Sequence, residues 1–92
     1  MDEKSKHIKK FYADWCGPCK AITPMIDSIR DKINVIDVDV ESDAGRSLAV
    51  EFSVRSLPTL ILMEGGTVLD KKVGLRNADE LNEWISTKTK EI

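Results

Sequence analysis

Apolar and polar positions change their period several times along the chain, and each change marks a predicted element. Residues 7–12 mix aromatic and aliphatic side chains with lysines, a pattern typical of a short strand. From Pro18 onward, isoleucines recur at steps of four, three and four, the period of an amphipathic helix that we expect to run to about residue 32. Pro18 suits the first helical turn, whereas Pro24 lies inside the helix and predicts a kink rather than a helix end.

The middle of the chain predicts a second strand and a short helix. Residues 34–40 alternate apolar side chains with aspartates, so the period becomes two and one face of this strand is apolar. The apolar positions of that face are Ile36, Val38 and Val40. Residues 43–52 show a weaker helical pattern, and Gly45 lowers the helical propensity at its start. We therefore expect a short second helix here.

The last third of the chain predicts a hairpin followed by a helix. Residues 59–63 are apolar at nearly every position, as in a strand covered on both faces, and a Gly-Gly pair then predicts a turn into an antiparallel strand over residues 67–73. Asn77, three residues before Glu80, resembles a capping box. The final helix then carries an apolar stripe formed by Leu81, Trp84 and Ile85.

The predicted order is β-α-β-α-β-β-α, which places the chain in the α/β class. We expect a four-stranded mixed sheet with helices on both faces. Right-handed crossovers predict that the first three strands run parallel and that the last runs antiparallel at one edge. A chain of 92 residues suffices for one small core, so residues 1–92 are expected to form a single domain.

Charge and hydropathy narrow the function classes. Fourteen basic and sixteen acidic side chains give a net charge of -2, so the chain has no overall positive field for nucleic acid or an anionic membrane. No apolar run is long enough for a signal-peptide core or a membrane span. We therefore expect a cytoplasmic monomer whose partners are proteins or small molecules.

The candidate chemistry lies in a Cys-x-x-Cys pair between the first strand and the first helix. The unpaired N–H groups of a helix N-terminus favour negative charge, which is expected to lower the pKa of the Cys16 thiol. Cys16 would then attack a disulfide, and Cys19, further into the helix, would resolve the mixed disulfide. Gly17 allows a substrate backbone to approach, and Pro18 fixes the backbone between the sulfurs.

Two other interpretations of the cysteines are a zinc site and an inert buried pair. A structural zinc ion takes about four ligands, but His7 is the only histidine and there is no second Cys-x-x-Cys. We therefore expect no metal and no cofactor other than the redox-active disulfide itself.

Several motifs resemble those of the thioredoxin family. Residues 15–20, Trp-Cys-Gly-Pro-Cys-Lys, are similar to the thioredoxin active-site hexapeptide without a mismatch. Pro24 falls where thioredoxins kink their active-site helix, residues 54–60 resemble the segment that holds their cis-proline, and Val73 with Gly74 matches a third substrate-facing element. The resemblance covers about residues 8–88, with the motifs in the family's order.

The resemblance implies how a substrate would bind. The peptide bond before Pro58 is expected to be cis, and the main chain of Leu57 to pair with an extended substrate segment. An apolar surround would be formed by Trp15, Pro18, Gly74 and Leu75. Leu75 stands where a smaller residue is usual, so the resemblance leaves the width of the groove open.

The chain also departs from the family. Only fifteen residues precede Cys16, so we expect the usual N-terminal strand and helix to be lacking, which leaves residues 34–40 at a sheet edge. Thioredoxins place an interior acid where this chain has Lys10, and a lysine near the position of Asp37. We hypothesise a reversed ion pair between Lys10 and Asp37 beneath Cys19. Alternatively, the lysine side chain extends to solvent or Asp37 faces away.

The resemblance implies a thiol-disulfide oxidoreductase that reduces protein disulfides. Its electron donor would be a reductase such as thioredoxin reductase, although a glutathione system also fits. The alternatives are a glutaredoxin-like or isomerase-type redox protein and a thioredoxin-fold binding subunit without catalysis.

Overall fold

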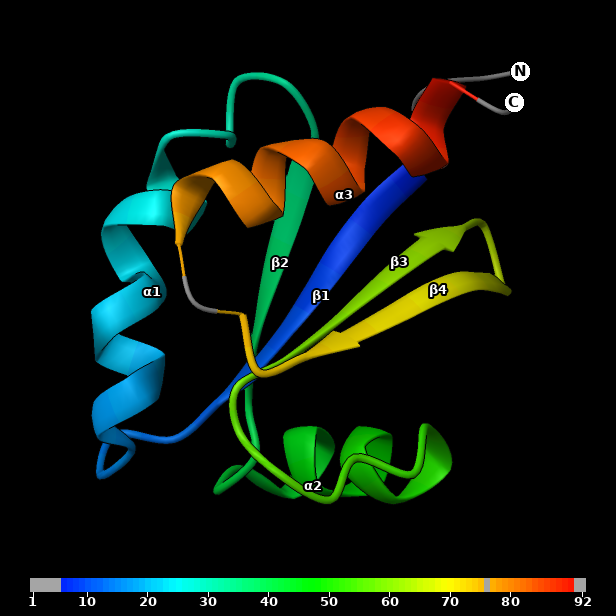
Figure 1. Cartoon of the computed structure of the whole chain (residues 1–92). Coiled ribbons are helices and arrows are strands. Elements are labelled where there is room, and N and C mark those ends of the chain that lie inside the picture. The colour runs from blue at the N-terminus through cyan, green and yellow to red at the C-terminus, as the bar shows by residue number, and fades with distance from the viewer. Residues whose placement is uncertain (1–5, 76, 91–92) are drawn as a thin grey trace.

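The computed structural model describes residues 6–75 and 77–90, and the predicted order of strands and helices is confirmed. The strands form one mixed sheet in the order β2-β1-β3-β4, with helices on both faces (Figure 1). Within the described residues, no helix is both long and apolar enough to cross a membrane. The elements are β1 (Lys6–Tyr12), α1 (Gly17–Asp27), β2 (Asn34–Asp39), α2 (Asp43–Glu51), β3 (Thr59–Glu64), β4 (Thr67–Val73) and α3 (Ala78–Lys90).

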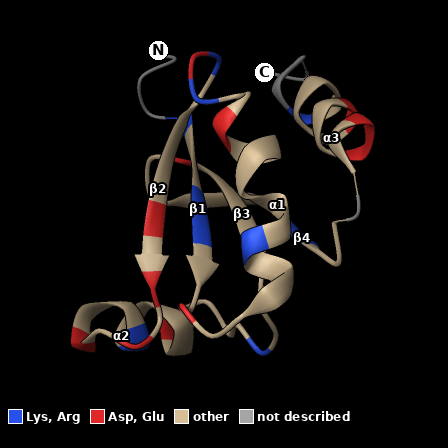
Figure 2. Cartoon of the chain, turned by 90° about the vertical axis from the view of Figure 1, so that its left-hand side faces the viewer, with Lys and Arg blue, Asp and Glu red and all other residues tan. Residues whose placement is uncertain are grey.

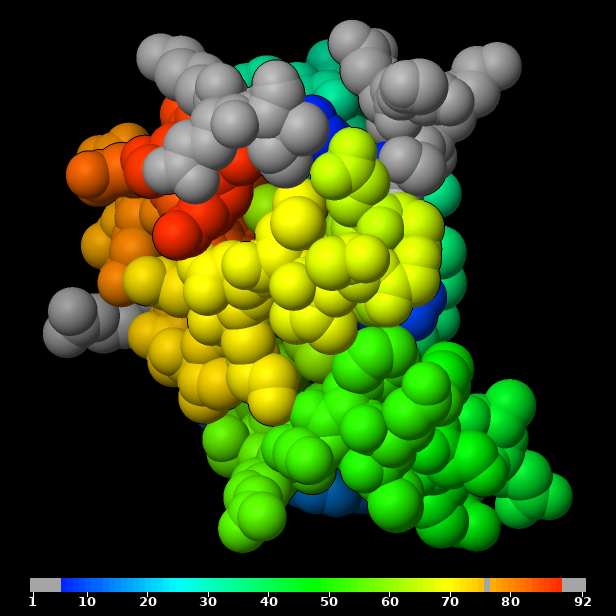
Figure 3. All heavy atoms as spheres, turned by 90° about the vertical axis from the view of Figure 1, so that its right-hand side faces the viewer, coloured from blue at the N-terminus to red at the C-terminus, as the bar shows by residue number. Residues whose placement is uncertain are grey.

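The direction of β3 differs from the prediction. Strands β1 and β2 run parallel (Figure 2), but β3 is antiparallel to β1 and β4 is antiparallel to β3. The expectation of three parallel strands is therefore wrong. Helix α2 has nine residues, about 14 Å, and lies past the end of the sheet instead of running back along it (Figures 1 and 3). The chain consequently enters β3 at the end of the sheet where it left β2.

Two apolar clusters lie on opposite faces of the sheet. Strand β3 contributes to both clusters, which confirms that it is covered on both faces. The larger cluster, beneath α1 and α3, contains Ile8, Ile22, Ile26, Ile29, Val35, Leu60, Leu62, Leu75, Leu81, Trp84 and Ile85. The smaller, with the apolar side chains of α2 packed against it, contains Phe11, Val38, Ile61 and Met63.

Strand β2 does not have the single apolar face that its alternation predicts. Val35 is buried in the larger cluster, whereas Ile36, on the opposite face, is exposed. Helix α2 lies near the carboxyl end of β2 and packs against Val38 and Val40, so it does not extend to Ile36. The prediction of a uniformly apolar face formed by alternate residues is therefore wrong at this position.

Helix α1 ends earlier than its isoleucine period predicts. It continues through Pro24 but ends at Asp27 instead of near residue 32. The Ser28 hydroxyl donates to the Met25 carbonyl at 2.6 Å, and the next hydrogen bond, from Ile29 N–H to Ile26 O, already spans only three residues. Ile29 nevertheless remains buried, because these turns keep the apolar period after the α-helix has ended.

Candidate active site

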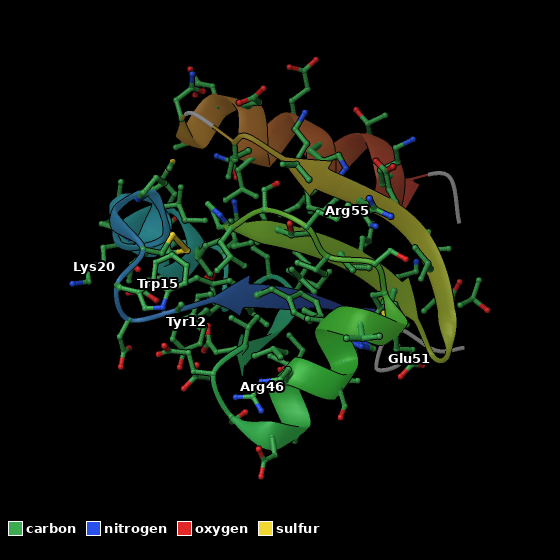
Figure 4. The ribbon with its side chains drawn as sticks, turned by 90° about the horizontal axis from the view of Figure 1, so that it is seen from below. Tyr12, Trp15, Lys20, Arg46, Glu51 and Arg55 are labelled. Carbon is green, nitrogen blue, oxygen red and sulfur yellow. A yellow bond between two sulfur atoms is a disulfide. The ribbon has the colours of Figure 1, made fainter. Side chains whose placement is uncertain are left out.

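A disulfide joins Cys16 and Cys19 at the point where β1 leads into α1 (Figure 4). Cys16 is the N-cap residue of α1, and its Sγ accepts a hydrogen bond from the Cys19 backbone N–H at 3.1 Å. The Cys16 N–H in turn donates to the Ala13 carbonyl at 3.1 Å, which closes the turn after β1. Both cysteines are buried, with exposed fractions of 4% for Cys16 and 2% for Cys19.

The N-terminus of α1 supplies the electrostatic setting of the sulfurs. The backbone N–H groups of the first helical turn have no partner within the helix, and the helix dipole places partial positive charge there. Gly17 and Pro18, the first two residues of the helix, are exposed and leave the approach to Cys16 uncovered. When the disulfide is reduced, this setting favours the thiolate form of Cys16.

Trp15 lies at the surface beside the disulfide and is held by a residue that the sequence did not indicate. Its side chain is 70% exposed and lies beside the sulfurs in Figure 4. The indole Nε1–H donates to Glu41 Oε2 at 2.9 Å, which fixes the ring between the active-site turn and the segment after β2. Glu41 belongs to no motif, so only the fold reveals this contact.

A groove of about 510 Å³ opens beside Cys16. Its far wall is the segment before β3, where the peptide bond from Leu57 to Pro58 is cis, as the resemblance implies. Pro58 is buried, while the half-buried Leu57 lines the groove. The Thr59 hydroxyl donates to the Ser56 carbonyl at 2.6 Å and fixes this turn. The full lining is Trp15, Cys16, Gly17, Pro18, Val40, Ala49, Val54, Arg55, Ser56 and Leu57.

The turn after β4 differs from the expected arrangement. Val73 and Gly74 are exposed, and Gly74 has a φ of 79°, which suits glycine. Leu75 is buried in the cluster beneath α1 and α3, so its side chain lies in the core rather than in an apolar surround. None of the three lines the groove beside Cys16. The groove beside Cys16 is therefore formed without Leu75, because burial in the core takes this side chain away from the surface.

Lys10 and Asp37 lie next to each other on β1 and β2, in the same paired position (Figure 2). Lys10 Nζ is 3.9 Å from Asp37 Oδ1, and Lys10 is buried, with 5% of its surface exposed. The side chain of Asp37 is 39% exposed and also binds Arg30, whose Nη2 lies 3.1 Å from its Oδ2. Hydrogen bonds to Asp27 and then to Asp37 raise the pKa of the Arg30 guanidinium. Sequence reasoning missed Arg30, which lies in the turns after α1.

A second cavity, of about 340 Å³, places these charges next to the resolving cysteine. Cys19 lines this cavity but not the groove, whereas Cys16 lines the groove but not this cavity. Burial, and secondarily Asp39 and Asp14, raises the pKa of the Tyr12 phenol, so this wall of the cavity is neutral near pH 7. The cavity is lined by Lys10, Tyr12, Ala13, Asp14, Cys19, Lys20, Thr23, Arg30 and Asp37.

The described residues contain no group of three or more His, Cys, Asp or Glu side chains that could hold a metal ion. The reactive groups that the site does contain are its two sulfurs, and they can exchange a disulfide with another molecule.

Comparison with known proteins agrees with this geometry. The thioredoxin family model matches residues 1–87. The chain is 38% identical over 80 residues to a thioredoxin of Rickettsia felis, covering 83% of this chain and 74% of that one. It is 34% identical over 86 residues to a thioredoxin of Mycoplasmoides gallisepticum, covering 92% and 86%. A mutant thioredoxin from Halobacterium salinarum superposes with a TM-score of 0.83 at 32% identity, covering 95% of this chain and 77% of the other.

The family match, the relatives and the fold lead to the same assignment, and the Cys-x-x-Cys pair lies where its chemistry requires, at a helix N-terminus beside an open groove. The chain therefore belongs to the thioredoxin family and is a thiol-disulfide oxidoreductase.

Proposed function

We propose that the protein reduces disulfides in other proteins, with Cys16 as the nucleophile and Cys19 as the resolving thiol. The observation that carries this proposal is the separation of the two cysteines between two cavities. Cys16 lines the groove that is open to a substrate, and Cys19 lines the smaller cavity behind it. The first sulfur to meet a substrate is therefore that of Cys16.

The exchange proceeds in two steps. The Cys16 thiolate attacks one sulfur of the substrate disulfide, a new S–S bond forms, and the other substrate sulfur leaves as a thiolate. Cys19 then loses its proton and attacks the Cys16 sulfur, which releases the second substrate thiolate. Two electrons have passed to the substrate, and the protein is left with the Cys16–Cys19 disulfide.

The groove suits an extended substrate segment. In our proposal, the main chain of Leu57 pairs with that segment, next to the cis peptide bond before Pro58. Trp15, Gly17 and Pro18 supply the contact surface around the reacting sulfur, and all three line the groove. Val73 and Gly74, exposed at the end of β4, would contact the substrate outside the groove.

In the cell, the cycle needs a donor that reduces the Cys16–Cys19 disulfide again. We propose a reductase of the thioredoxin reductase type in the cytoplasm, and a redox cycle that uses no cofactor beyond the disulfide itself. A reducing compartment is consistent with a chain whose only two cysteines both lie in the active site. Nucleic acid and membranes are not among the proposed partners, given the net charge of -2.

Trapping the mixed disulfide tests the assigned roles. The Cys19→Ser variant, incubated with a disulfide-containing protein, should remain covalently joined to it, because Cys16 attacks and nothing resolves the product. The matched Cys16→Ser variant should give little or no adduct. Mass spectrometry of the two mixtures measures this, and an adduct that forms mainly with Cys16→Ser would reverse the assignment.

The redox potential tests the direction of transfer. Equilibration of the protein with defined dithiol buffers should give about minus 270 mV, the value typical of a reducing thioredoxin. A value near about minus 180 mV would instead favour isomerase-type work. If a Cys16→Ser/Cys19→Ser double variant still supports the function of a partner protein, the chain is a binding subunit and not a reductase.

A further inference from the structure

Lys10 is the only charged side chain that is buried among those the structure describes. A buried ammonium group is costly unless nearby groups compensate it, so its position calls for an explanation. The side chain originates on β1 and faces the same side of the sheet as α1. It lines the same cavity as Cys19.

The contacts of Lys10 leave its positive charge only partly compensated. Nζ donates to Thr23 Oγ1 at 3.5 Å, lies 5.6 Å from the centre of the Tyr12 ring, and is 3.9 Å from Asp37 Oδ1. Asp37 is bound more closely by Arg30, at 3.1 and 3.2 Å to its two oxygens. Because Asp37 divides its negative charge between two cations, it does not cancel the charge of Lys10.

Lys10 and Cys19 share the second cavity and are connected through Thr23. The Thr23 hydroxyl accepts from Lys10 Nζ and lies 3.2 Å from the Cys19 carbonyl, to which it donates. The other charged groups on the cavity wall are Asp14 and Lys20, which are both exposed, and the Arg30–Asp37 pair. Figure 4 shows Lys20 directed away from the protein. Solvent therefore screens those charges more than the charge of Lys10.

We propose that Lys10 is a positioning residue for the resolving step, in which its ammonium group stabilises negative charge on the Cys19 sulfur. Cys19 gives its proton to water in the cavity, its thiolate attacks the Cys16 sulfur, and the substrate thiolate leaves. This inference rests on the proposed reductase function. It assigns the buried charge to the second step of the reaction and not to the first, because the cavity contains Cys19 and not Cys16.

The two steps can be measured separately. A coloured aromatic disulfide reagent releases one thiolate when Cys16 attacks and a second when Cys19 resolves the adduct, so stopped-flow absorbance gives two phases. The Cys19→Ser variant should retain only the first phase, which shows that the second phase belongs to Cys19. The pH profile of the second phase then reports the apparent pKa of Cys19.

Lys10→Met should raise that apparent pKa by about one unit, the lower end of the effect of a nearby opposite charge. At pH values below the midpoint of the second-phase profile, the second phase of this variant should be about tenfold slower than in the wild type. Lys10→Arg, which keeps the charge, should restore most of the wild-type profile. Lys9→Met is the matched control, because Lys9 is the neighbouring lysine on β1, is not on the cavity wall, and should leave both phases unchanged.

Asp37→Asn provides a test that does not depend on a core substitution. It removes negative charge from the cavity wall, so the second-phase pKa should fall. The inference is overturned if folded Lys10→Met shows the same pH profile of the second phase as the wild type. It is also overturned if the second-phase pKa is unchanged or raised in Asp37→Asn. In both cases the reductase function stands. If the wild-type protein itself lacks the two phases, the proposed function fails instead.

Discussion

Gly45 is the residue at which the first turn of α2 approaches the end of β2. A Cβ built on Gly45 would overlap the carbonyl of Asp39 and would lie 2.9 Å from Ser42 Oγ. Ser42 Oγ also accepts a hydrogen bond from the Gly45 N–H at 3.0 Å, as the N-cap of the helix. The capping hydroxyl of Ser42 and the close approach of β2 both leave no room for a side chain here, which explains a glycine at a helical position despite its low helical propensity.

We predict that Gly45→Ala destabilises the protein by about 1–3 kcal/mol, the usual cost of overpacking. Alanine in an unhindered helix would instead stabilise it by up to about 1 kcal/mol, so the sign of the change tests the packing. Urea unfolding of the oxidised protein measures this. Gly66→Ala is the control, since among the described residues no atom lies within 4 Å of its Cβ position, and it should change stability by less than about 0.5 kcal/mol. A Gly45→Ala variant as stable as the wild type would contradict the close approach.

At the scale of elements, a partly buried hydrogen bond joins α3 to β4. Trp84 Nε1–H donates to Asp70 Oδ2 at 2.6 Å, and Lys88 Nζ lies 3.9 Å from the same oxygen. The Trp84 hydrogen bond lowers the pKa of Asp70 below its ordinary value, against the opposing effect of burial. Since a lowered pKa means that folding favours the carboxylate, this contact stabilises the protein above the ordinary pKa of an aspartate.

We predict that Asp70→Asn costs about 1 kcal/mol at neutral pH, because the acceptor of the Trp84 hydrogen bond loses its negative charge, on a side chain that is 34% exposed and thus partly screened. The difference from the wild type should shrink as the pH falls below about 4 and the wild-type carboxylate becomes protonated. Unfolding curves at several pH values measure this. Asp31→Asn, an exposed carboxylate in the turns after α1, serves as the control. A stability loss for Asp70→Asn that does not vary with pH would contradict the role of charge.

The sequence predicted each element that is encoded by a local period, but not the arrangements that depend on packing. The direction of β3 depends on where α2 lies. Helix α1 ends at Asp27, and the next backbone hydrogen bonds, from Ile29 and Arg30, span three residues instead of four. At the active site, the cysteine motif and the segment around Pro58 were recognisable because each is contiguous. Glu41 could not be predicted, since it meets Trp15 only because β1 pairs with β2. Arg30 could not be predicted either, since it meets Asp37 only where the turns after α1 lead back along β2.

At the scale of the whole molecule, the sheet has two outer strands. Strand β2 pairs with β1 on one side, and no described strand pairs with its other side. An unpaired edge can recruit a second copy of the chain unless charges oppose it. Asp37 and Asp39 supply such charges on β2, while β4, at the opposite edge, carries Asp70, Lys71 and Lys72.

We predict a monomer in solution, because one symmetric register that could join two copies through β2 places like charges together. Antiparallel pairing of two β2 strands about Val38 would set Asp37 of one copy opposite Asp39 of the other, twice in each dimer. Sedimentation velocity over a range of concentrations should give one species of 10.3 kDa.

The Cα radius of gyration of 12.5 Å matches the roughly 12 Å expected for a compact chain of this length, which small-angle scattering can check independently.

The Asp37→Asn/Asp39→Asn double variant removes both charges. Asp39 Oδ1 now accepts a hydrogen bond from the Glu41 N–H at 2.9 Å, and the amide oxygen of an asparagine introduced at this position can still accept it. The contact of residue 39 should therefore survive in this variant, and the protein should associate more strongly as its concentration rises. Wild-type protein that sediments as a dimer at micromolar concentration, or a double variant no more prone to associate, would show that these aspartates do not protect the edge.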